Sequence, residues 1–203
     1  MTRGVLIDLG GVLARGVWPE AARAWAGRFG TTPGELLAAI FGGSDTTVLV
    51  GAVDEDTWWR RVAARLDAPA ALVDALRADA AARETWNEPL LDRIAAVHGP
   101  LRTAVVSNAW PGVRARADAR GLAGFMDAIV LSCEFGAAKP DAAIYRHALD
   151  RLGVEPSAAL FVDDTEANVA AARGLGMTAH LHRDTASTAA AIVAFAGSGR
   201  LVP

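Results

Sequence analysis

The chain has 203 residues, of which 52% are hydrophobic and 21% charged, and its formal net charge is -3. This length predicts one domain, with or without a large insertion, that buries roughly 70% of its unfolded surface. The charge balance gives no reason to expect nucleic acid as a partner. Cys133 is the only cysteine, which excludes intrachain disulfides and thiolate metal clusters. We therefore expect a cytoplasmic globular protein with no targeting segment and no membrane span.

The first apolar run, Val5 to Ile7, predicts a buried strand that ends at Asp8, just before Gly10 and Gly11. Ligands of open α/β sheets bind outside the carboxyl ends of the strands, and glycine lets the backbone approach a ligand closely. These features favour Asp8 as a nucleophile. A lone aspartate before two glycines is equally typical of a carboxylate that closes a turn, so the rest of the chain has to decide.

Helical spacing dominates residues 15–88, where no clear β alternation is found. We predict helices over 19–29, 33–41, 54–66 and 69–82, with Asp54 as an N-cap and a loop over 42–53. The stretch between Asp8 and Ser107 is far longer than the dozen or so residues that a crossover needs. The helical block is therefore expected to be an insertion that covers Asp8 as a cap. Its tryptophans are interpreted mainly as packing, with one or two facing a ligand.

After residue 87 the pattern changes to alternating strands and helices. We expect Asn87 to cap a helix over 89–98, and apolar runs over 103–106, 128–131, 159–162 and 177–181 to form strands. Helices over 113–120, 141–152 and 166–173 separate these runs, which is the pattern of a parallel sheet. The expected fold class is α/β, with a doubly wound, Rossmann-like parallel sheet in residues 1–14 and 89–203 and an all-helical cap in residues 15–88.

Polar side chains follow the predicted strands at the same edge of the sheet. Three carboxylates packed together repel one another unless a cation lies among them, and oxygen ligands beside an anion site favour Mg²⁺. A phosphate held by Mg²⁺, an ammonium, a hydroxyl and backbone amides would leave phosphorus open to attack by the first carboxylate. The chain would then form and hydrolyse an aspartyl-phosphate. The residues concerned are Asp8, Ser107, Asn108, Lys139, Asp163 and Asp164.

Four ordered motifs resemble those of the haloacid-dehalogenase-like (HAD) hydrolase superfamily, most of whose members are Mg²⁺-dependent phosphatases. They read DLGGVL from Asp8, SN from Ser107, KPD from Lys139 and DDTEAN from Asp163. The match spans the whole chain, and residues 15–88 correspond to that family's helical cap of the first type. The resemblance implies Asp8 as nucleophile and metal ligand, the Gly10 carbonyl and Asp164 as metal ligands, and Asp163 as a ligand directly or through water.

The same resemblance assigns Ser107 and Asn108 to binding of the phosphoryl group, and Lys139 to holding that group and orienting Asp8. One departure concerns Gly10, because phosphatases of this family usually place a second aspartate there as general acid and base. A glycine carbonyl can still bind metal, but it cannot protonate a leaving group. The departure puts the rate and the substrate range in doubt more than the class of reaction.

The leading interpretation is a Mg²⁺-dependent phosphomonoesterase for a small phosphorylated metabolite, with a sugar phosphate as one candidate, acting as a monomer or homodimer. A haloacid dehalogenase that uses Asp8 without metal is the alternative enzyme, and it would explain Gly10. A catalytically weak protein that binds phosphometabolites is the third interpretation. His180 and His182 would share one side of a strand, and a solvated or core-satisfied pair is favoured over a metal site.

Overall fold

A single parallel sheet organises the protein, whose computed structural model describes residues 2–15, 17–43 and 45–198. The sheet has five strands in the order β3-β2-β1-β4-β5. Since β1 lies in the centre between β2 and β4, the three polar groups that follow these strands are neighbours. The strands are β1 (Gly4–Ile7), β2 (Arg102–Ser107), β3 (Ala128–Leu131), β4 (Ala159–Asp163) and β5 (Thr178–Leu181).

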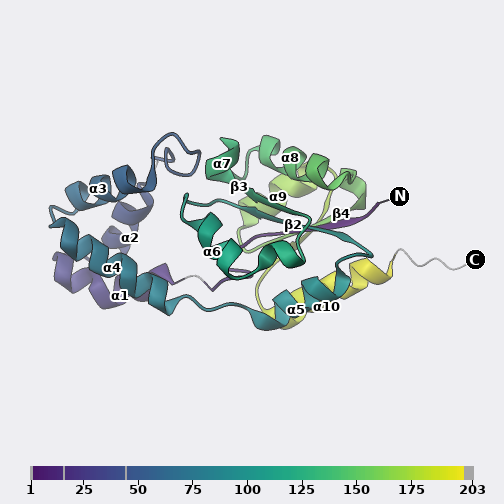
Figure 1. Ribbon diagram of the computed structural model, residues 1–203, viewed down its shortest axis with the longest axis horizontal. Helices are drawn as coiled ribbons and strands as arrows, with labels where there is room; N and C mark the ends of the chain where they lie inside the picture. The colour runs from purple at the N-terminus through teal and green to yellow at the C-terminus, as the bar shows by residue number, and fades with distance from the viewer. Residues whose placement is uncertain (1, 16, 44, 199–203) are drawn as a thin grey trace, which may run out of the picture.

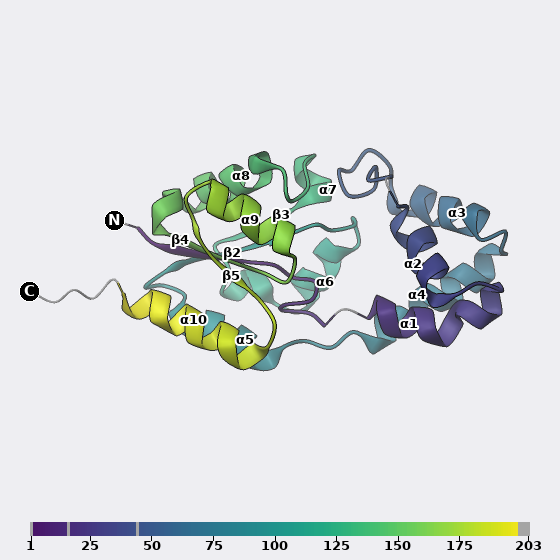
Figure 2. The ribbon, with the colours of Figure 1, turned by 180° about the vertical axis from the view of Figure 1, so that it is seen from behind.

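Helices cover both faces of the sheet, so the predicted α/β, doubly wound architecture is confirmed (Figures 1 and 2). One face packs against α5 (Glu88–Val97), α6 (Val113–Ala119) and α10 (Thr185–Gly197). The other packs against α8 (Ala142–Leu152) and α9 (Glu166–Gly174). A strand buried on both faces needs apolar residues at successive positions, and this is why β1 reads as an unbroken apolar run.

Four helices form a separate group beyond the carboxyl ends of the strands, opposite the side where β1 begins and α10 ends (Figure 1). We call α1 to α4 and their connections the helical unit. It has its own hydrophobic cluster, and the apolar faces of its helices pack on one another there. The domain boundaries at 14/15 and 88/89 stay a prediction. The helices are α1 (Trp18–Trp25), which continues as a 3₁₀ turn η1 (Ala26–Phe29), α2 (Pro33–Phe41), α3 (Glu55–Arg65) and α4 (Ala70–Arg83).

One predicted helix cap agrees with its sequence signal and one does not. The Asp54 carboxylate accepts the Thr57 N–H at 2.7 Å, which confirms Asp54 as the N-cap of α3. Asn87 occupies the N-cap position of α5, but its side chain makes no capping bond, so that prediction was wrong. Its amide donates instead to the Val12 carbonyl at 3.1 Å and to the Thr185 hydroxyl at 3.0 Å. Asn87 thus ties the segment after β1 to α10.

Two helices are additional to the predicted ones, namely α7 (Ser132–Phe135) and α10. The C-terminal run has few large apolar residues and little amphipathic patterning, and its helix is stabilised by packing of Ile192 against α5 and the sheet. Along the described ranges, none of the helices combines the length and the apolar character that crossing a bilayer requires.

Candidate active site

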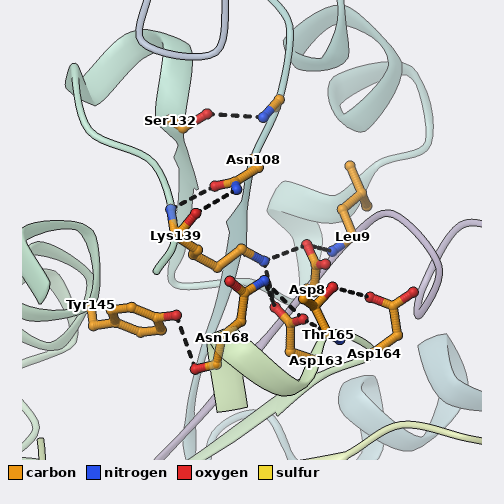
Figure 3. A network of polar contacts seen from close by, with 11 residues as sticks. Asp8, Leu9, Asn108, Ser132, Lys139, Tyr145, Asp163, Asp164, Thr165 and Asn168 are labelled. Atoms are coloured by element: carbon orange, nitrogen blue, oxygen red, sulfur yellow. Dashed lines mark hydrogen bonds and ion pairs between the residues drawn. The ribbon is translucent and has the colours of Figure 1, made fainter. Parts of the chain in front are cut away.

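An ammonium group lies between two carboxylates at the carboxyl edge of the sheet (Figure 3). Lys139 Nζ is 2.8 Å from Asp8 Oδ1 and 2.7 Å from Asp163 Oδ2. All three residues are buried, with 4%, 7% and 0% of their surface exposed in the order Lys139, Asp8, Asp163. Buried charges are tolerated when they are paired and hydrogen-bonded, so this triad is held as a unit.

Asp163 receives donors on both of its oxygens. Oδ1 accepts the Thr165 N–H at 2.8 Å, and the Asn168 side-chain amide lies 3.0 Å from Oδ1 and 3.1 Å from Oδ2. The Tyr145 hydroxyl in turn donates to the Asn168 carbonyl at 3.0 Å. Any direct contact between Asp163 and a metal would have to displace one of these donors. Its position favours a second role, as the fixed counter-charge of Lys139.

Asp8 presents its two oxygens differently. Oδ1 accepts the Leu9 N–H at 2.7 Å and pairs with Lys139, whereas Oδ2 has no donor among the described residues. Burial raises the pKa of Asp8 to about 6, with the positive charge of Lys139 opposing the shift and Asp163 adding to it. The arrangement therefore leaves one carboxylate oxygen available for attack or for a cation.

Oxygens of Asp8, Asp163 and Asp164 lie within 4.8 Å of one another. Opposite ligands of an octahedral Mg²⁺ lie about 4.2 Å apart, so this hard-oxygen set is close to the spacing that such an ion needs. Asp164 comes close to the first motif, since a Cβ on Gly11 would lie 2.1 Å from its Oδ2. Gly11 has φ +80°, which further favours glycine there. At Gly10, by contrast, a Cβ would meet no atom within 4 Å.

Asn108 holds the backbone of Lys139. Its amide donates to the Lys139 carbonyl at 2.8 Å, and its Oδ1 accepts the Lys139 N–H at 2.7 Å. With its carboxamide engaged in this way, the predicted phosphoryl contact would fall to the backbone of this loop. Ser107 ends β2 and is 3% exposed, and the Ser132 hydroxyl accepts the Ala109 N–H at 3.0 Å and orders the same loop.

Four supporting residues were not foreseen from the sequence. Asn168 lies on α9, five residues after Asp163, and Tyr145 lies on α8, six residues after Lys139. The available signal was therefore a polar residue within two helical turns of each motif. Thr165 also lies within the DDTEAN motif, whereas Ser132 offered no such signal. The histidine pair set aside earlier is bonded within the protein, because His180 Nε2 and His182 Nδ1 lie 3.1 and 2.7 Å from the Thr188 hydroxyl.

Comparison with solved structures places the fold among HAD enzymes. A HAD family enzyme from Bacteroides thetaiotaomicron, in complex with magnesium and inorganic phosphate, superposes with a TM-score of 0.70 at 18% identity, over 90% of this chain and 95% of that one. L-2-haloacid dehalogenase from Xanthobacter autotrophicus, with chloropropionic acid covalently bound, gives a TM-score of 0.66 at 23% identity, over 100% of this chain and 85% of that one. At these identities the similarity shows the fold.

Sequence comparison points the same way. Bifunctional epoxide hydrolase 2 of Rattus norvegicus is 34% identical over 114 residues, which are 53% of this chain and 21% of that protein. The chain thus spans about a fifth of the length of this curated relative. The profile of the haloacid dehalogenase-like hydrolases matches residues 2–176. With four motifs meeting at one sheet edge and a family match over most of its length, the chain belongs to the haloacid dehalogenase-like hydrolases.

Proposed function

We propose that the protein is a Mg²⁺-dependent phosphomonoesterase that acts on a small phosphorylated metabolite in the cytoplasm. The observation that carries this proposal is the Lys139 ammonium fixed between Asp8 and Asp163, beside a third carboxylate. The phosphoryl group of a phosphate ester is a dianion, and three carboxylates at this edge would repel it. An ammonium and a metal ion together would offset that repulsion. The complex of magnesium and phosphate with the Bacteroides enzyme is consistent with this chemistry.

Asp8 Oδ2 attacks phosphorus, a bond forms between that oxygen and phosphorus, and the bond to the ester oxygen breaks with its electron pair on the leaving alkoxide, which takes a proton from water. Lys139 keeps Asp8 ionised and oriented, and it offers positive charge to the phosphoryl oxygens. Water then attacks the aspartyl-phosphate, which regenerates Asp8 and releases inorganic phosphate. Bound at Asp8, Asp164 and the Gly10 carbonyl, with Asp163 directly or through water, Mg²⁺ would neutralise charge on the phosphate.

Hydrolysis of 4-nitrophenyl phosphate, measured against Mg²⁺ concentration and in EDTA, tests the proposal. We expect activity to need the metal, and Asp164→Ala to raise the Mg²⁺ concentration for half activity because one anionic ligand is lost. Undiminished turnover in EDTA would overturn the phosphatase assignment. Asp79→Ala, on α4 of the helical unit, removes a carboxylate away from the cluster and serves as the matched control.

Dehalogenation of a 2-haloacid by Asp8 remains the second candidate, and two observations favour it. Gly10 lacks the usual acid, and Lys139 already balances part of the charge that otherwise demands a cation. Release of chloride from 2-chloropropionate in EDTA would select it. If neither reaction proceeds while inorganic phosphate still binds in the presence of Mg²⁺, the third candidate, a binding protein with a weak catalytic site, stands.

A further inference from the structure

Four aromatic rings meet where the helical unit touches the loop after β2. We call Trp18, Phe41, Trp59 and Trp110 the aromatic cluster. Trp110, from the loop, lies with its ring centroid 5.4 Å from Trp18, 5.8 Å from Phe41 and 5.2 Å from Trp59. Trp110 is thus the one ring of the sheet domain in a cluster otherwise supplied by the helical unit.

The members of the cluster differ in exposure. Trp59 and Trp110 are 4% and 9% exposed, whereas Phe41 is 46% exposed. Among the described residues, Phe41 and Val193 stand out as exposed large hydrophobic side chains. Phe41 does not protrude alone, since its ring centroid lies 6.2 Å from that of half-buried Trp18 in an edge-on arrangement. Two partly exposed rings backed by two buried ones form a wall with a free apolar surface.

The wall lies close in sequence to the candidate active site at the carboxyl edge of the sheet, which we call the catalytic edge. Trp110 follows Asn108 by two residues, so their Cα atoms lie within about 7 Å of each other. Asn108 in turn is bonded to the backbone of Lys139. The helical unit lies beyond the carboxyl ends of the strands (Figure 1), on the side from which a leaving group would extend.

The wall is also fixed before any ligand arrives. The Glu55 carboxylate, at the start of α3, accepts the Gly112 N–H at 2.7 Å and the Trp59 Nε1–H at 3.2 Å. Arg77 pairs with the same carboxylate at 3.2 Å and lies 4.9 Å over the Trp59 ring. These contacts fix Trp59 and the loop that carries Trp110, which are the two buried rings behind the wall. Less conformational entropy is then lost when a ligand packs on the wall.

We propose that Trp18 and Phe41, backed by Trp110, receive the leaving group and select phosphate esters that carry an aromatic ring. The inference rests on the proposed phosphatase function and names its substrate class. An aromatic ring finds offset or edge-on partners there. A sugar would bring several hydroxyls that need hydrogen-bonding partners when buried, and Arg77, whose guanidinium lies over the Trp59 ring, is already paired with Glu55. A sugar phosphate is therefore the less favoured candidate.

The test compares two substrates with the same primary alkoxide leaving group, propyl phosphate and 3-phenylpropyl phosphate, so that only the ring differs. We expect kcat/KM to be higher for the phenyl compound, and Phe41→Ala to lower the ratio of the two values by about 3- to 10-fold. Phe29→Ala is the matched control, because Phe29 belongs to the same helical unit and contacts Trp25 instead of Trp110. Its ratio should equal that of the wild type.

Binding of the two corresponding phosphonates, measured by calorimetry with Mg²⁺, separates the two proposals. Hydrolysis of both esters with a ratio near one, or a ratio that Phe41→Ala leaves unchanged, overturns the aromatic wall and keeps the phosphatase. If neither ester nor 4-nitrophenyl phosphate is hydrolysed but the phenyl phosphonate binds more tightly and Phe41→Ala removes that gain, the wall stands and the phosphatase falls. Equal affinities without hydrolysis refute both. Thermal unfolding of each variant establishes that it is folded.

Discussion

The catalytic edge and the aromatic cluster meet at the same end of the sheet but are built on opposite principles. At the edge, buried charges are held by short, directional bonds from strand ends and helix starts. In the cluster, rings from three helices and a loop pack without directional bonds between them. Directional bonds fail when one atom is changed, whereas ring packing tolerates small changes in shape. Chemistry should therefore depend on single atoms at the edge, and specificity on surface area in the cluster.

Asp8→Asn should give the largest effect, because an amide oxygen is a much poorer nucleophile and metal ligand. We expect kcat for 4-nitrophenyl phosphate to fall by more than about 10³-fold. The fold should persist, since Lys139 keeps Asp163 as a partner. Single-turnover assays and circular dichroism measure the two effects. Activity within tenfold of the wild type would remove Asp8 from the reaction.

Lys139→Met should lower the free energy of unfolding of the protein. Two buried carboxylates lose their cation, which costs about 3–5 kcal/mol of unfolding free energy. Lys139 opposes the rise in the pKa of Asp8 that burial causes, so its loss raises that pKa further. Between the pKa of Asp8 in the unfolded chain and its raised pKa in the folded protein, Asp8 is protonated only in the folded metal-free protein. The free energy of unfolding therefore falls as pH rises through this interval.

Urea unfolding in EDTA at pH 5 and pH 7.5 checks this prediction, with the larger loss expected at pH 7.5. Asp163→Asn combined with Lys139→Met should recover part of the stability, because one unpaired charge is then removed. An equal loss at both pH values would contradict the coupling between Lys139 and Asp8.

Gly10→Asp should have a moderate effect that depends on the substrate. General acid catalysis contributes roughly 10²- to 10⁴-fold and matters most for basic leaving groups. Wild-type kcat/KM should therefore fall steeply as the basicity of the leaving alcohol rises. The variant should flatten that dependence, since a Cβ at position 10 meets no atom within 4 Å. A flat profile in the wild type would mean that another acid already operates.

Asp54→Ala should give the smallest effect and tests whether the helical unit can weaken without disturbing the chemistry. Loss of this N-cap costs about 1 kcal/mol of unfolding free energy. Turnover of a small substrate such as propyl phosphate should stay unchanged, because Asp54 contacts Thr57 and lies on the exposed start of α3. A matching loss of kcat would mean that the start of α3 is part of the site.

Local patterns were enough to foresee the strands and the polar residues that end them. Each strand is an apolar run, and a parallel sheet brings the carboxyl ends together, so Asp8, Lys139 and Asp163 could be expected to meet. The three-carboxylate argument did not foresee that a neighbouring ammonium and an amide also balance Asp163, whose role as a metal ligand stays a prediction. The role of Asn108 in substrate binding stays a prediction. Local patterns could not reveal that its carboxamide bonds to the backbone of Lys139, 31 residues along the chain.

Long-range packing accounts for what the patterns did not reveal. The sequence around Trp110 does not distinguish it from any other tryptophan in a loop. Its role in the aromatic cluster follows only from the helices that surround it. The same holds for α10, whose sequence is mostly small residues and whose helix depends on contacts with α5. Local periodicity carries no information about such partners.

The loop after β2 is fastened at both ends, and this has a mechanical consequence. Asn108 binds the backbone of Lys139 at one end, while Trp110 and the Gly112 N–H are held by the helical unit at the other. Any tilt of the helical unit that keeps these contacts would move the loop and, through Asn108, the backbone of Lys139. A substrate large enough to push the helical unit away from the sheet would thereby move Lys139 away from Asp8. Under the proposed function, substrate size would then change turnover as well as affinity.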